Sequence, residues 1–282
     1  MSPTSLAVGL IIISAISHAL VGVLLKRSND KLVLRIVLGA TSAAASLPFI
    51  FILPALPPEV WLVLALGISL LIIYQIAQAS AFTRGDMSLV YPIMRGFAPA
   101  LTAVFALFVL NESLSNVELG GLAIVVAALV GFGWPGRTPQ KGFAAAVALA
   151  LCVGALTSLY TVVDAKGIRL SPVKFSFIAW LFVLEGTIGA TLFSIWKRKD
   201  LIEKIKLDAR DGVLAGGLGI ISYSTALYAF SLSAVAPLAA LRESSVIFGA
   251  IFAALLLKEP FGKRRMSLAA LLVAGLALMH MT

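Results

Sequence analysis

Charge is scarce in this 282-residue chain, and so are the residues that build catalytic or metal sites. Only 12% of the residues are charged, and the chain has two histidines and one cysteine. The lone Cys152 excludes an intrachain disulfide framework, and histidines at opposite ends of the chain do not form a metal-ligand cluster. No GxxxxGK motif followed by Ser or Thr is present, which argues against direct coupling to ATP. We therefore expect no enzyme, no cofactor and no metal. A membrane-embedded enzyme using Glu185, Glu243 and His18 is the minor alternative.

Apolar residues dominate instead, at 60% of the chain, and the mean hydropathy is +1.04. About 20 apolar residues in a helix cross the hydrocarbon core of a bilayer. Runs of this kind lie at 5–25, 33–53, 60–81, 88–110, 117–134, 142–163, 172–196, 211–230, 234–257 and 266–281. The connectors between these runs are short. The pattern predicts an all-α polytopic membrane protein with ten transmembrane helices.

The fourth and ninth runs share a pattern. Arg95 lies 17 residues before Glu112, and Arg242 lies 17 residues before Glu259. Such duplication at half the chain length indicates an internal repeat, with residues 1–136 as the first half and 137–282 as the second. Five spans per half is an odd number, so the second half enters the membrane from the opposite side. We therefore predict a 5+5 inverted repeat around a central cavity, an architecture typical of secondary transporters.

The two arginines carry the strongest functional signal. A guanidinium at the centre of a bilayer costs at least about 2.5–3.5 kcal/mol on insertion scales. Either the side chains of Arg95 and Arg242 reach the membrane surface, or they face a hydrated cavity, which we favour. Prolines at 92, 99 and 237 are predicted to bend these helices because proline supplies no amide proton.

Further polar residues within the spans complete the predicted site. Tyr74 and Gln78 are four residues apart and share a helix face. His18 and Glu185 are candidates for a counter-ion or for proton coupling, against a structural role as hydrogen-bonded or ion-paired groups. Tyrosines near span ends are also typical of the membrane interface. The predicted substrate-binding residues are Tyr74, Gln78, Tyr91, Arg95, Trp180, Tyr223, Arg242 and Glu243.

The distribution of basic residues predicts orientation. Of the 22 lysines and arginines, 17 lie in odd-numbered connectors and three in the others, and the remaining two are Arg95 and Arg242. The positive-inside rule places the odd connectors in the cytoplasm and both termini outside. Because the basic residues are spread over short loops without interleaved aromatics, they do not indicate nucleic-acid binding.

Pro99, the thirteen-residue spacing to Glu112 and the following ELGGLAIVVAALVGF segment resemble the drug/metabolite transporter superfamily, in particular its EamA-type ten-helix branch. The second half, with LLLKEPFGKRRMSLAALLVAGLALM, fits the same pattern, but Val246 stands where Pro99 stands in the first. The resemblance implies a basket of helices around a cavity and export of small metabolites, as in YddG-like amino-acid exporters. It also implies cytoplasmic termini, in conflict with the charge distribution, which we retain.

The sequence thus predicts a secondary transporter of the inner membrane. We expect it to export small metabolites, most of all amino acids, including aromatic or other apolar ones, by alternating access. The arginines would bind an acidic group, Tyr74, Tyr223 and Trp180 would pack against the rest, and Glu243 or Glu185 would receive an amine. The alternatives are efflux of drugs or cationic compounds, or a passive channel. The expected partners are a small-molecule substrate and the lipid bilayer. The sequence is compatible with a monomeric transporter.

Overall fold

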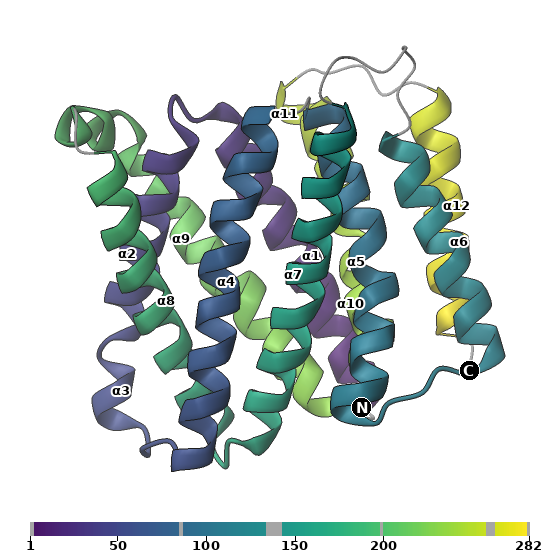
Figure 1. Cartoon of the computed structure of the whole chain (residues 1–282), viewed down its shortest axis with the longest axis horizontal. Helices are drawn as coiled ribbons and strands as arrows, with labels where there is room; N and C mark the ends of the chain where they lie inside the picture. Colours follow the sequence, from purple (N-terminus) through teal and green to yellow (C-terminus); the bar gives the residue numbers. More distant parts are fainter. Residues whose placement is uncertain (1–2, 85–86, 134–142, 198–199, 258–262, 281–282) are drawn as a thin grey trace. The chain divides into compact units, whose positions relative to one another are not determined.

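A computed structural model describes residues 3–84, 87–133, 143–197, 200–257 and 263–280 of the chain, and the regular secondary structure in these ranges is entirely helical (Figure 1). The helices are α1 (Pro3–Arg27), α2 (Lys31–Ser46), α3 (Phe49–Ile52), α4 (Pro58–Arg84), α5 (Met87–Leu110), α6 (Asn116–Gly133), α7 (Phe143–Leu170), α8 (Lys174–Trp196), α9 (Leu201–Leu232), α10 (Val235–Arg242), α11 (Ser245–Leu257) and α12 (Lys263–Met279).

The helices agree with the ten predicted spans. Eight described segments are long and apolar enough to cross a bilayer, and α6 and α12 are shorter apolar helices. Helices α2 and α3 together make the second span, over Lys31–Ile52. The ninth predicted span differs from expectation, because the run 234–257 is divided into α10 and α11 by Glu243 and Ser244. The chain is a multi-pass membrane protein with a helical arrangement of five spans per repeat.

Packing divides the chain into two compact units. Unit 1 comprises Met1–Ile68, Gly167–Ser233 and Ser245–Glu259, and unit 2 comprises Ser69–Lys166, Ala234–Ser244 and Pro260–Thr282. Each unit therefore takes helices from both halves of the sequence. The boundary between the sequence repeats, at residues 136 and 137, stays a prediction.

In unit 1, α2 packs against α8 and α9, and α1 packs against α9 and α11 (Figure 1). The α2–α8 crossing depends on two glycines: a Cβ at Gly186 would collide with the carbonyl oxygen of Gly39. Small residues let helix backbones approach closely in a membrane, where contact and not hydrophobicity drives association. Helices α1 and α9 are also joined by hydroxyls, since Ser14 Oγ donates to the Ser222 carbonyl at 2.6 Å and Ser222 Oγ donates to the Ser14 carbonyl at 3.0 Å.

The turn between α1 and α2 is held by two aspartates. Asp30 is the N-cap of α2 and accepts hydrogen bonds from the backbone amides of Leu32 and Val33. Its carboxylate also pairs with Lys197 Nζ at 2.8 Å. Partial burial acts to raise the pKa of Asp30, but Lys197 and the two amides outweigh it, so the pKa lies below the usual value. Asp208 on α9 accepts from the backbone amides of the α1–α2 turn, at 3.1 Å each.

In unit 2, α5 packs against α6 and α10, and α6 lies alongside α12 (Figure 1). As at the α2–α8 contact of unit 1, glycines allow the backbones of α6 and α12 to approach closely. A Cβ at Gly121 would lie 2.7 Å from the Gly275 carbonyl oxygen, and a Cβ at Gly275 would lie 2.9 Å from that of Gly121. Unit 2 also contains α7 up to Lys166, and the C-terminal part of α4 from Ser69.

Candidate functional site

Short helix α10 places two charged residues in the apolar interior of unit 2. Six of its eight residues are buried, which fixes the helix against its neighbours. Pro237 lies in its first turn, where a missing amide proton leaves no helical hydrogen bond unmade. The start of α10 is held by Glu112, whose Oε2 accepts from the Val235 amide at 2.7 Å. Glu112 thus has a structural role at the start of α10, and the end of α10 presents Arg242 and Glu243.

Glu243 pairs with Arg95 across the interface between α10 and α5. Arg95 Nη1 donates to Glu243 Oε1 at 3.0 Å, and the two side chains are 13% and 7% exposed. Removing one partner of such a pair leaves a buried charge uncompensated, at a cost of about 3–5 kcal/mol. The two residues are separated by 148 positions in the sequence, so only the packing of α10 on α5 brings them together.

Arg242 and Asp164 add a second pair of charges to this region. The charges of both Arg95 and Arg242 act on the Glu243 carboxylate. Both guanidinium groups and the Asp164 carboxylate also act on the Tyr160 hydroxyl. Two arginines and two carboxylates balance in formal charge. A balanced cluster suits an interior of low dielectric constant, because unpaired charge is costly to bury there.

Tyrosines and a glutamine lie beside the charges. Gln78 Nε2 donates to Tyr74 Oη at 2.7 Å, as their four-residue spacing on α4 predicts. The Tyr74 ring meets the Tyr160 ring edge-on, with 5.3 Å between centroids and an interplanar angle of 62°. Tyr74 also packs against a small apolar core that includes Met94 and Val153. Unit 2 therefore combines buried charge, polar amide and hydroxyl groups, and aromatic surface. We call the residues that supply these groups the charge cluster: Tyr74, Gln78, Arg95, Tyr160, Asp164, Arg242 and Glu243.

Other predicted site residues belong to unit 1. Trp180 on α8 packs edge-on against Trp61, with 4.7 Å between ring centroids. Tyr223 on α9 packs edge-on against Phe182 at 6.4 Å. His18 in α1 and Glu185 in α8 are half-buried. The part of these residues in binding cargo stays a prediction.

Besides Arg95, three of the predicted positions lie on α5: Tyr91, Pro92 and Pro99. Pro99 is buried, and the helix continues through it to Leu110. The side chains of Tyr91 and Pro92 lie outside the described residues. Hydroxyls gather beside Pro99: Thr102 Oγ1 and Ser158 Oγ both reach the Ala98 carbonyl, at 2.9 and 2.7 Å.

Sequence reasoning did not select Asp164 or Ser244, and it left Tyr160 unassigned. Asp164 is fully buried, yet it follows the apolar run 142–163 by one residue and so was placed in a connector. Helix α7 in fact continues to Leu170. The signal that could have found Asp164 is its spacing, because it lies four residues after Tyr160 and on the same helix face. Ser244 was hidden inside an apolar run that reads as one continuous span.

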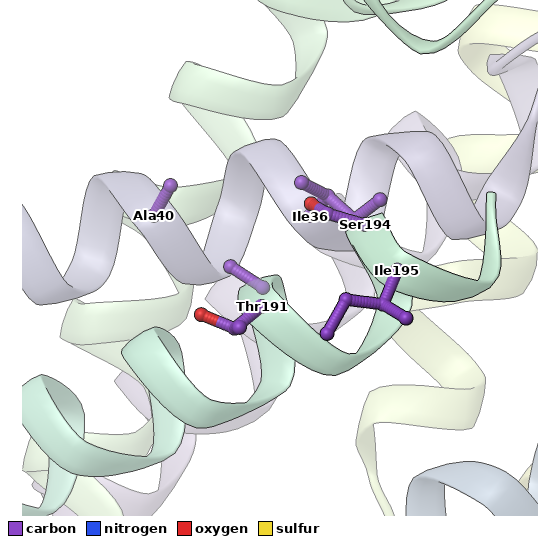
Figure 2. A pocket seen from close by; sticks show the side chains of 6 residues that line it. Ile36, Ala40, Thr191, Ser194 and Ile195 are labelled. Atoms are coloured by element: carbon purple, nitrogen blue, oxygen red, sulfur yellow. The ribbon is translucent and has the colours of Figure 1, made fainter. Parts of the chain in front are cut away.

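One surface hollow of about 430 Å³ lies between α2 and α8 of unit 1 (Figure 2). Its lining is aliphatic apart from the hydroxyls of Thr191 and Ser194, with Ile36 and Ile195 beside them. It contains no charged side chain and none of the predicted substrate-binding residues. We therefore locate the candidate site at the charge cluster and not at this hollow.

Ten apolar spans, together with a cluster of buried and balanced charge in unit 2, define a polytopic membrane protein of the transporter class. The EamA-like transporter family matches residues 5–134 and 144–281, and the chain belongs to this family, within the drug/metabolite transporter superfamily. It is therefore a transporter of small molecules and not an enzyme. A search of curated proteins found no match. Several solved structures match, among them a crystal structure with a TM-score of 0.70 at 17% sequence identity, covering 99% of this chain and 96% of the other, which supports the fold.

Proposed function

We propose that this transporter exports amino acids or closely related small metabolites across the inner membrane, by alternating access, in the manner of YddG-like carriers. The observation that carries the proposal is the charge cluster, in which Arg95 and Glu243 pair at 3.0 Å with side chains that are 13% and 7% exposed. Charged residues in membrane spans are rare and mark substrate or ion pathways. A zwitterion brings both signs of charge and could exchange with the ionic partners without leaving net charge buried.

In this mechanism the guanidinium groups of Arg95 and Arg242 receive the cargo carboxylate, because a guanidinium presents a fork of donors to two oxygens. Glu243 balances the arginines and receives the cargo's positive end. Tyr74 and Tyr160 supply aromatic surface for an apolar side chain. Odd-numbered connectors face the cytoplasm, as the 17 basic residues there favour.

The test is uptake of a labelled amino-acid panel into proteoliposomes, with and without a pH gradient. We expect at least one amino acid to exchange against its unlabelled form, which distinguishes a carrier from a channel. Arg95→Ala and Arg242→Ala proteins, correctly inserted, should lose this exchange. Arg264→Ala is the matched control, because Arg264 on α12 is exposed and donates to the Gly131 carbonyl. Normal exchange by both cluster variants would contradict the proposal.

Efflux of cationic compounds is the second candidate, and the buried carboxylates of Asp164 and Glu243 favour it. A lipophilic cation needs a negative partner in the membrane and does not need the arginines. Transport of a cationic dye that survives Arg95→Ala, together with no exchange of any amino acid, would support this candidate over the first.

A further inference from the structure

The break between α10 and α11 contains two consecutive buried polar residues. Helix α10 ends at Arg242, and the next two amides bond back three residues: Glu243 N to the Ala240 carbonyl and Ser244 N to the Leu241 carbonyl, both at 3.0 Å. Hydrogen bonds of this spacing tighten the last turn of a helix. Glu243 is 5% exposed and Ser244 is 7% exposed. The chain thus turns inside the protein with a carboxylate and a hydroxyl at the turn.

Only some of the polar side-chain atoms at this turn form hydrogen bonds with described residues. Glu243 Oε1 accepts from Arg95, whereas Glu243 Oε2 and Ser244 Oγ are buried and have no hydrogen-bond partner in the described part of the chain. Leaving a buried polar atom unsatisfied costs about 1–3 kcal/mol, and more for a charged group. Buried polar atoms without partners are uncommon in folded proteins. Two such atoms on adjacent residues, one of them in the charge cluster of a transporter, indicate a ligand.

The chemistry of the two atoms selects the ligand group. A carboxylate oxygen only accepts hydrogen bonds, and a serine hydroxyl can accept while it donates elsewhere. The last carbonyls of α10 add negative potential at the same turn. A cargo carboxylate would be repelled by Oε2. A primary ammonium instead brings three donors and a positive charge, which match the acceptor character of a carboxylate oxygen and of a hydroxyl.

We propose that Glu243 Oε2 and Ser244 Oγ form an ammonium subsite that binds the primary amine of the cargo. This proposal rests on the proposed function, since it specifies the group by which the cargo is recognised. Glu243 then serves two partners, with Oε1 holding Arg95 and Oε2 holding the amine. Ser244 becomes a specificity-determining residue, because its hydroxyl contributes to the binding of amines and has no favourable role toward acids.

The subsite has a consequence for selectivity. An analogue that lacks the amine leaves Oε2 unpaired, and sites built around hydrogen-bonded groups reject such analogues strongly. We expect the deaminated analogue to bind at least about tenfold more weakly than the amine, corresponding to one lost charged hydrogen bond.

The experiment measures binding to the purified full-length protein in nanodiscs, with L-phenylalanine, phenethylamine and 3-phenylpropanoate as a matched series. The amine should compete with phenylalanine, and the acid should compete at least about tenfold less well. Ser244→Ala should weaken phenylalanine and phenethylamine by about three- to tenfold, the effect of one hydrogen bond, and leave the acid unchanged. Ser244→Thr retains the hydroxyl and should restore binding, while gel filtration and thermal unfolding confirm that the variants fold.

The matched control is Ser176→Ala. Ser176 on α8 is also buried, and its hydroxyl also has no partner in the described ranges, but its neighbours Phe175 and Phe177 carry no charge. This variant should bind the whole series normally. Equal binding of acid and amine, no competition by phenethylamine, or an unchanged amine affinity in Ser244→Ala would each overturn the subsite. A Ser244-dependent response to sodium ions in place of the amine would overturn it as well.

Its failure is distinguishable from failure of the proposed function. If the amine binds with the expected Ser244 dependence while no amino acid exchanges in proteoliposomes, the subsite stands and the export of amino acids is wrong. If amino acids exchange but the acid competes as well as the amine, the function stands and the subsite is wrong.

Discussion

The two stretches that contain Arg95 and Arg242 have similar sequence patterns but fold differently. Helix α5 runs unbroken from Met87 to Leu110, through Arg95 and Pro99. The stretch after Arg242 has no proline at the corresponding position, and yet the helix stops there and restarts at Ser245 as α11. Proline therefore does not decide which of the two helices breaks.

The difference follows the polar residues. In α5, Thr102 Oγ1 of the same helix and Ser158 Oγ of α7 both bond to the Ala98 carbonyl, so α7 is tied to α5 beside Pro99. After Arg242 come Glu243, Ser244 and Ser245, three polar residues in a row. There the helix ends in a tight turn and presents the Glu243 carboxylate to Arg95. The first repeat therefore has a continuous helix, α5, whereas in the second repeat the break between α10 and α11 positions Glu243 beside Arg95.

The largest expected effect comes from separating the charges that link the two stretches. Arg95→Ala and Glu243→Ala should each lower the free energy of unfolding by about 3–5 kcal/mol, because each leaves a buried charge without its partner. The Arg95→Ala/Glu243→Ala double variant should lose clearly less than the sum of the two. Thermal unfolding of the four purified proteins gives the coupling directly. Additive losses would show that the pair does not act as a unit.

A proline scan tests the break itself. Val246→Pro, which copies the proline of the first repeat, should cost less than about 1 kcal/mol, because residue 246 lies in the first turn of α11 and its amide has no helical partner. Ala250→Pro, one turn further along, should cost about 3 kcal/mol or more. The melting temperatures of the two variants, compared with that of the unmodified protein, test this difference. Equal costs would mean that the second stretch is a continuous helix like α5.

The sequence predicted the spans well because hydropathy measures what the bilayer requires. Ten apolar runs correspond to the helices, and the four-residue spacing of Tyr74 and Gln78 predicted their contact. Hydropathy does not, however, register where a helix ends outside the membrane. Helix α9 begins at Leu201, about ten residues before its apolar run, and α7 extends past its run to Leu170 and so contains Asp164.

The charge cluster could be predicted only in part. Depth in the membrane singled out Arg95 and Arg242, and either Glu243 or Glu185 was expected to receive the amine of the cargo. The pairing with Arg95 depends on how α10 packs against α5, and the open oxygen depends on a helix break that an apolar run conceals. Both the pairing and the unpaired oxygen depend on how separate segments are arranged, so the residue pattern of one segment does not predict them.

A smaller effect should come from the link between the end of α5 and the start of α10. Glu112→Ala removes the carboxylate that accepts from the Val235 amide at 2.7 Å, and it should cost about 1.5–3 kcal/mol, as for other hydrogen bonds to charged groups. Glu118→Ala is the matched control, since Glu118 Oε2 accepts from the Ser115 amide in an exposed turn at the start of α6. The control should cost about 1 kcal/mol or less. Thermal unfolding measures both losses. A larger loss for Glu118→Ala than for Glu112→Ala would show that Glu112 does not stabilise α10.

The smallest expected effect concerns the hydroxyls beside Pro99. Ser158 Oγ reaches both the Ala98 carbonyl of α5 and the Gly154 carbonyl of α7, at 2.7 and 2.9 Å, so it joins two helices. The backbones are close here, since a Cβ at Gly154 would lie 3.1 Å from the Met94 carbonyl oxygen. Ser158→Ala should therefore lower the free energy of unfolding by about 1 kcal/mol.

Thr157→Val is the control for Ser158→Ala, because Thr157 Oγ1 donates only to the Val153 carbonyl of its own helix. Removing a hydroxyl that returns to its own backbone should change stability little, since the carbonyl retains its main-chain donor. A difference in melting temperature between the two variants would show that α7 supports α5 beside its proline. If both variants unfold at the same temperature, α5 remains unbroken for a reason within its own sequence, and the contrast with α10 and α11 rests on Glu243 and Ser244 alone.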